Sequence, residues 1–135
     1  MLNANPSSGI VTDKRVTTYR DLIVWQKSVD LVEATYRLSK KLPAREMFGL
    51  TSQMQRAAVS IPANIAEGHG RRHLGDYLHY LSIANGSLKE LETHCIVAVR
   101  LGYWGADEGE SVLRVASEVG RMLARLAQKL RVKSL

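Results

Sequence analysis

Histidine and cysteine side chains are the first place to look for metal binding or nucleophilic catalysis in this 135-residue chain. His69 and His73 are four residues apart, which is the spacing of two ligands on one helix face. Gly68 and Gly70 disfavour a helix there, so the pair is not held in that geometry. The single cysteine, Cys95, falls on the apolar face of a predicted helix, where cysteine acts as a small inert hydrophobe. We therefore expect no metal site and no cofactor.

Carboxylates and loop motifs give no better basis for catalysis. Glu90 and Glu92 are two residues apart, so on a helix they point in different directions and cannot work as an acid–base pair. The chain contains no nucleophile elbow, no P-loop and no glycine-rich dinucleotide fingerprint. The sequence thus predicts a protein that is not an enzyme. Only a buried cluster of strongly perturbed titratable groups in a pocket would revive an enzymatic interpretation.

Polar residues inside otherwise apolar helical segments suggest an architectural role instead. Seven of them lie in two segments: Gln53, Arg56, Asn64, Glu67, Ser87, Glu90 and Glu92. They are either ordinary solvent-facing surface or a packed polar network, between the two segments or across a subunit boundary. In the network hypothesis, Asn64 bonds backbone groups that Pro62 leaves unpaired, and Arg56 pairs with a glutamate of the second segment. Gly86 would let a neighbouring helix approach closely.

Apolar residues at helical spacing predict four helices, and no stretch shows the period-two alternation of a strand. The expected helices cover about residues 19–42, 50–67, 74–103 and 107–132, after a flexible N-terminal tail over residues 1–17. Thr18 and Asp21 form a capping box at the start of the first helix, and Pro62 kinks the second. Short connections predict an all-α fold, an antiparallel up-down-up-down four-helix bundle over residues 18–135.

The composition is that of an ordinary globular domain, with 45% hydrophobic and 24% charged residues. No apolar run approaches the ~20 residues of a membrane-spanning helix, and the N-terminus has no leader-like apolar stretch. One cysteine cannot build an internal disulfide framework. We expect a cytoplasmic protein without membrane contact.

The net charge of +6, from 19 basic and 13 acidic residues, is unevenly distributed. An up-down bundle brings the start of the first helix, the turn at 68–73 and the end of the fourth helix to one end. That end collects eight cations: Lys14, Arg15, Arg20, Arg71, Arg72, Lys129, Arg131 and Lys133. Such a cluster is typical of a surface that binds nucleic-acid phosphates. Bases at the end of the fourth helix also complement its dipole, but this alternative does not cover Arg71 and Arg72.

The first helix carries apolar side chains around more than half of its circumference, whereas one bundle core needs a stripe only about 100° wide. The excess includes Ile23, Val24 and Trp25. Because large exposed apolar patches are rare on monomers, we expect a second copy of the chain to cover these residues. They are the candidate interface of a homo-oligomer.

Four segments together resemble a known family. They are residues 21–27 (DLIVWQK), 49–58 (GLTSQMQRAA), 60–68 (SIPANIAEG) and 86–93 (GSLKELET). In this order they are similar to the four-helix-bundle family of proteins encoded in intervening sequences of bacterial 23S ribosomal RNA genes. The resemblance covers about residues 19–104, and the fourth helix matches only in its apolar pattern. Asn85 departs from the basic or small residue that members often carry, and His73 replaces a serine-like cap of the third helix.

The resemblance implies a cytosolic bundle that assembles as a homopentamer. It also implies similarity to accessory proteins of diversity-generating retroelements, which bind nucleic acid and a reverse transcriptase through basic surface. We therefore expect a non-enzymatic homo-oligomeric scaffold whose basic end contacts RNA or DNA phosphates. The alternative is a protein–protein adaptor or structural oligomer whose charge serves solubility alone, with a protein partner and no nucleic acid.

Overall fold

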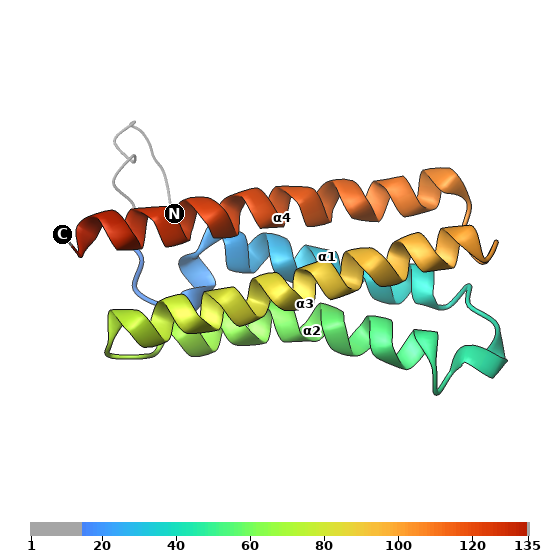
Figure 1. The fold of residues 1–135 in the computed structure, drawn as a ribbon, viewed down its shortest axis with the longest axis horizontal. Helices are drawn as coiled ribbons and strands as arrows, with labels where there is room; N and C mark the ends of the chain where they lie inside the picture. The colour runs from blue at the N-terminus through green and yellow to red at the C-terminus, as the bar shows by residue number, and fades with distance from the viewer. Residues whose placement is uncertain (1–14, 135) are drawn as a thin grey trace, which may run out of the picture.

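Four α-helices lie side by side along one axis in the computed structural model, which describes residues 15–134 (Figure 1). They are α1 (Ile23–Ser39), α2 (Leu50–His69), α3 (Leu74–Arg100) and α4 (Ala106–Lys133). Two short 3-10 turns, η2 (Tyr19–Asp21) and η3 (Ala44–Glu46), flank α1. No strand occurs within the described residues. The prediction of an all-α, four-helix fold is confirmed.

Each helix has two neighbours. Within residues 15–134, α1 contacts α2 and α4, α3 contacts the same two helices, and the diagonal pairs make no contact. Figure 1 shows the chain turning back at each connection. The α1–α2 and α3–α4 connections lie at one end, which we call the tied end (residues 40–49 and 101–109). The α2–α3 connection lies at the other, the basic end (residues 15–22, 70–73 and 129–134), together with the start of α1 and the end of α4.

The core runs between the four helices and consists of aliphatic side chains from all of them. Its largest fully buried members are Leu31, Met54, Ile61, Ile65, Leu88, Leu91, Val112 and Val119. These positions follow the three-to-four spacing of a helix face, so the apolar pattern located them. Burying each one stabilises the fold by about 1.5–3 kcal/mol relative to leaving it exposed. Among the described residues, no helix combines the length and the apolar character needed to cross a membrane.

α1 buries small hydroxyl residues where large aliphatic ones would be expected. Ser28 and Thr35 are fully buried, and Ser39 is 3% exposed. Each hydroxyl donates a 2.8 Å hydrogen bond to a carbonyl of its own helix, those of Trp25, Leu31 and Tyr36 respectively. Because these hydroxyls are satisfied locally, they can face the core without an unpaired polar group.

The ends of α1 differ from the predicted range 19–42. The Thr18–Asp21 capping box is present, but it caps η2 and not α1. Leu22 then adopts an extended conformation (φ −74°, ψ 124°), so α1 begins only at Ile23 and has no side-chain cap. Thr17, which the sequence places in the tail, donates from its backbone and its hydroxyl to the Asp21 carboxylate at 2.9 and 2.8 Å.

Glycine roles are the main correction within the helices. Gly68 does not end α2, which continues to His69, and it has no positive φ. A side chain at Gly68 would clash with α3, because a Cβ there would lie 2.8 Å from the Cβ of Tyr80. Gly86, expected to admit a close neighbour, has nothing within 4 Å of such a Cβ, so that prediction is wrong. The close approach of α2 and α3 occurs at Gly68.

Pro62 lies within the continuous helix α2. Proline lacks the N–H that would bond the Ala58 carbonyl four residues earlier. Asn64 donates instead to the Ser60 carbonyl at 2.8 Å, so it does not serve the group that Pro62 leaves without its usual donor. The predicted kink at Pro62 stays a prediction.

Candidate nucleic-acid interface

Three separate segments build the basic end. A groove lined by Asp21, Leu22, Arg125 and Lys129 places the start of α1 beside the end of α4. A second groove, lined by Leu78, Ala127 and Arg131 among others, places the first turns of α3 beside the same part of α4. Figure 1 shows the α2–α3 connection at this end as well. Residues far apart in the chain are thus gathered on one extremity of the bundle.

The cationic side chains of this end are mostly exposed and unpaired. Exposed among the predicted residues are Arg15, Arg20, Arg71, Arg72, Lys129, Arg131 and Lys133, whereas Lys14 lies outside the described residues. Within residues 15–134, Arg71 is the one member of this set that forms an ion pair. Six cations therefore face solvent without a neutralising partner among the described residues, which is the electrostatic condition for attracting phosphate.

Arg71 is held in place by α2 and α3 together. Its guanidinium donates to Glu67 and to the Tyr80 hydroxyl, both at 2.8 Å, and lies 5.0 Å from the centre of the Tyr80 ring. Its pKa is raised, first by Tyr80 and then by Glu67. Arg71 therefore positions the α2–α3 connection and is less available to a ligand than Arg72.

The N-terminus of α3 adds backbone donors next to these arginines. His73 is the N-cap residue, and its side chain makes no capping hydrogen bond. The first N–H groups of a helix attract anions, because they lack intrahelical partners and lie at the positive end of the dipole. His73, which replaces a serine-like cap, thus provides no side-chain acceptor for the first N–H groups of α3, next to Arg72.

The tied end differs, because two of its carboxylates, Glu46 and Glu108, are bonded to groups of other elements. Lys41 donates to the Glu108 carboxylate, which also accepts the Gly105 N–H at 2.8 Å. Glu46 accepts the Leu50 N–H at 3.1 Å and the Tyr103 hydroxyl at 2.9 Å. These bonds lower the pKa of both carboxyl groups. The largest cause is the hydrogen bond from the Leu50 N–H for Glu46 and the hydrogen bond from Lys41 for Glu108.

The predicted polar network is smaller than the sequence suggested. Its centre is a 2.8 Å hydrogen bond between the hydroxyls of Ser60 and Ser87, which joins α2 to α3. Asn64 donates to the Ser60 hydroxyl at 2.9 Å. Ser60 was not singled out in the sequence, and its position one helical turn before Asn64 is the only signal that pointed to it.

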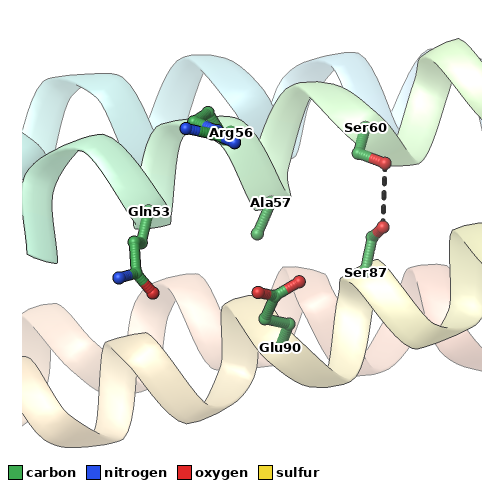
Figure 2. A pocket seen from close by; sticks show the side chains of 6 residues that line it. All are labelled: Gln53, Arg56, Ala57, Ser60, Ser87 and Glu90. Carbon is green, nitrogen blue, oxygen red and sulfur yellow. Dashed lines mark hydrogen bonds between the residues drawn. The ribbon is translucent and has the colours of Figure 1, made fainter.

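Gln53 and the charged residues Arg56 and Glu90 do not join the network. Gln53, Arg56 and Glu90 are exposed and line an open groove of about 400 Å³ between α2 and α3 (Figure 2). Figure 2 shows the Arg56 side chain directed away from Glu90, and Arg56 forms no ion pair with any described residue. The predicted Arg56–glutamate pair is therefore wrong.

The two remaining glutamates of the set pair within their own surroundings. Glu67 accepts from Arg71 at 2.8 Å, and Glu92 lies 3.4 Å from Lys89. Both pairs are local to a stretch of three or four residues, so neither bridges two helices. A long side chain on a helix reaches its i+3 and i+4 neighbours before it reaches another helix.

The candidate oligomer residues on α1 separate into three environments. Ile23 is 61% exposed and remains available to a second copy. Trp25 is half-buried, with its ring 5.2 Å from that of Tyr19. Val24 is only 5% exposed and belongs to the core of its own bundle, so its assignment to an interface is wrong. The helix turns 100° per residue, which places adjacent apolar residues on different faces.

Cys95 and the histidines were considered in the sequence as possible nucleophile and metal ligands. Burial, and then the charge of Glu92, raise the pKa of the Cys95 thiol to about 12, so it is protonated at neutral pH. Among the described residues, no three histidine, cysteine, aspartate or glutamate side chains are close enough together to hold a metal ion.

Comparisons with known proteins identify a matching family and a similar solved structure. Residues 20–125 match the model of a family described as 23S rRNA-intervening sequence protein. A solved structure from Bacteroides thetaiotaomicron, described as a protein with unknown function from the S23 ribosomal protein family, is 25% identical with a TM-score of 0.73. The similarity covers 78% of this chain and 98% of that one. A search of curated proteins finds no match.

Proposed function

This chain belongs to the 23S rRNA-intervening sequence protein family, and we propose that it is a non-enzymatic homo-oligomeric scaffold that binds RNA or DNA phosphates. The binding surface is the basic end. The observation that carries the proposal is the set of six exposed cations there without an ion-pair partner among the described residues: Arg15, Arg20, Arg72, Lys129, Arg131 and Lys133. Lysine and arginine clusters supply the sequence-independent part of nucleic-acid affinity.

Helix-dipole complementarity explains only part of this charge. Lys129, Arg131 and Lys133 stand in the last turns of α4, where cations are favourable in any helix. Arg72 directly precedes the N-terminus of α3, where a cation is mildly unfavourable for the helix itself. A bound phosphate would offset that cost, since it accepts from the arginine and from the first N–H groups of α3.

Assembly would multiply the effect. In a ring whose symmetry axis runs along the bundles, all basic ends point the same way, so their cations form one face. The family resemblance implies five copies. Several weak phosphate contacts on one scaffold raise the overall affinity, because every contact after the first is intramolecular.

The test is a filter-binding titration of structured RNA and of duplex DNA at two salt concentrations. The variant Arg72→Ala/Arg131→Ala removes two basic-end cations, and Arg37→Ala/Lys40→Ala removes two exposed cations near the tied end as the matched control. We expect only the first variant to weaken binding. The slope of the logarithm of the binding constant against the logarithm of the salt concentration should become shallower by roughly 0.7–0.9 per lost phosphate contact.

Two outcomes would contradict the proposal. Binding that is absent or independent of salt would remove the nucleic-acid role and favour the protein–protein adaptor, which predicts no co-purifying nucleic acid. Equal loss in both double variants would show that total charge, and not the basic end, is responsible.

A further inference from the structure

The connection before α2 presents an apolar knob to solvent, formed by Met47 and Phe48. Phe48, the chain's one phenylalanine, is 92% exposed, and Met47 is 55% exposed. The turn beneath them is fixed, because the Gly49 N–H donates to the Glu46 carbonyl at 2.9 Å and the Glu46 carboxylate bonds Leu50 and Tyr103. Phe48 is therefore held out in water by a braced turn, where a phenyl ring is unfavourable.

A groove of matching size lies between the end of α3 and the start of α4. Its walls are Ile96, Val99, Ala106, Gly109 and Leu113, and its volume is about 210 Å³. A cavity of ~150 Å³ lined by aliphatic side chains holds benzene, so this groove has room for one phenyl ring. Ile96 is 46% exposed and neighbouring Leu101 is 57% exposed, which extends the apolar surface around it. We call this the α3–α4 groove.

The knob and the α3–α4 groove lie at the same end of the bundle. The knob precedes α2 and the groove lies between α3 and α4, while Tyr103 of the α3–α4 connection donates to Glu46 beside the knob at 2.9 Å. Figure 1 shows the two connections at the same extremity of the bundle. Phe48 is 92% exposed and does not line the groove of its own chain, so its ring is available to the groove of a copy placed alongside.

The charges that border the two surfaces are complementary. Arg45 precedes the knob, is exposed, and lies 5.8 Å above the ring of Tyr103. Glu110 lines the groove and makes only a 3.6 Å pair with Arg114 of its own helix. Arg100 also lines the groove, but the Glu46 carboxylate beside the knob already accepts from Leu50 and Tyr103, so the complementary pair is Arg45 and Glu110. Opposite charges at the rim favour one orientation of approach.

We propose that Phe48 of one copy of this chain occupies the α3–α4 groove of a second copy. Different surfaces meet in this contact, so it is head-to-tail. Repetition of such a contact gives a ring when the rotation between neighbouring copies closes, and an open filament when it does not. The inference rests on the homo-oligomeric part of the proposed function and names the residues that would form it. In this proposal the Phe48 contact is the principal one between copies, in place of the α1 flank (Ile23 and Trp25).

Size-exclusion chromatography with light scattering over a range of concentrations tests the contact in the full chain. Phe48→Ser and Ile96→Glu change the knob and the groove wall. Ile83→Glu is the matched control, because Ile83 is on the same helix and is 38% exposed but lies outside the groove. We expect the first two variants to raise the dissociation constant at least about 10-fold and the control to leave it unchanged. Unchanged circular dichroism verifies that each variant is folded.

Cysteine cross-linking provides an independent readout. Cys95 is buried and protonated, so it does not compete with introduced thiols. Under oxidation, Phe48→Cys/Ala106→Cys should give a ladder of covalent dimers and larger species, because each copy has one knob and one groove. Neither single variant should do so. Equal cross-linking of Phe48→Cys alone would indicate contact between two knobs and overturn the proposal.

The outcomes separate this inference from the proposed function. A wild-type chain that is monomeric at every concentration overturns both the scaffold and the contact. An assembled wild type that is unaffected by Phe48→Ser overturns the contact alone. If Ile23→Ser dissociates the assembly while Phe48→Ser does not, the α1 flank is the interface.

Discussion

The two ends of the bundle use charged residues in opposite ways. At the tied end, side chains join elements distant in sequence: Lys41 bonds Glu108, Tyr103 bonds Glu46, and the Trp104 indole N–H donates to the Leu38 carbonyl at 2.9 Å. At the basic end, among described residues, the ion pair formed by the cationic set is local, from Arg71 to Glu67. One end is closed by polar cross-links, and the other leaves its cations in solvent.

The contrast between the two ends indicates where a ligand can bind in a four-helix bundle. A charge already bonded to a partner has little remaining attraction for a ligand, whereas an exposed cluster of like charges attracts anions over about a Debye length. The tied end is thus suited to stability and to contact between copies. The basic end is suited to binding a polyanion.

The largest test of this contrast compares the two tryptophans. Trp104 at the tied end is 3% exposed and hydrogen-bonded, so Trp104→Ala should lower the free energy of unfolding by about 3–5 kcal/mol. Trp25, near the basic end, is half-buried, and Trp25→Ala should cost clearly less. Urea denaturation followed by circular dichroism, at one fixed protein concentration, measures both. Equal losses would mean that the ends do not differ in stability.

A second test asks whether the basic end is loosely packed beneath its exposed charges. Gly68 lies against α3 there, so Gly68→Ala would force the Tyr80 backbone region to move and should destabilise by about 1–3 kcal/mol. Gly86→Ala on α3 has open space and should stabilise by about 0.5–1 kcal/mol, because alanine favours the helix. Opposite shifts in the denaturation midpoint are expected. A neutral Gly68→Ala would show that α2 and α3 can separate at this end without cost.

The smallest expected effect is a dependence on pH confined to the tied end. The pKa values of Glu46 and Glu108 lie below the ordinary value of 4.5 in the folded chain. Their contribution to stability is therefore full above about pH 4.5 and is lost as pH falls through the lower, folded values. Thermal unfolding between pH 7 and pH 3 should show a steeper acid loss in the wild type than in Glu46→Gln/Glu108→Gln. Parallel curves would indicate that these bonds contribute no stability.

Much of the fold could be read from residues close together in the chain. The burial of Met54, Ile61 and Val119 follows from their spacing, and the Thr18–Asp21 box forms within one turn. The incorrect predictions concern contacts between elements. Val24 and Ile23 are equally apolar, yet one is buried and the other exposed, because the packing of α1 on its two neighbours decides which face is covered.

The candidate site divides in the same way. The list of basic-end cations came from charge counting and helix order, but only the structure shows that Arg71 is engaged by Tyr80 while Arg72 has no ion-pair partner among described residues. The exposed Phe48 carried a faint signal, an apolar pair in a short connection between Pro43 and Gly49. Its meaning depends on the α3–α4 groove, which no local pattern reveals.

Helix number, the positions of most core residues and the family were determined by the amino-acid order alone, because hydrophobic spacing and short motifs act over three to ten neighbouring residues. The tertiary structure decided which charges find partners, where glycine admits a neighbouring helix and which apolar side chains stay in water. These depend on distances between residues up to 67 positions apart, as in Lys41 and Glu108, and such distances exist only once the four helices have packed.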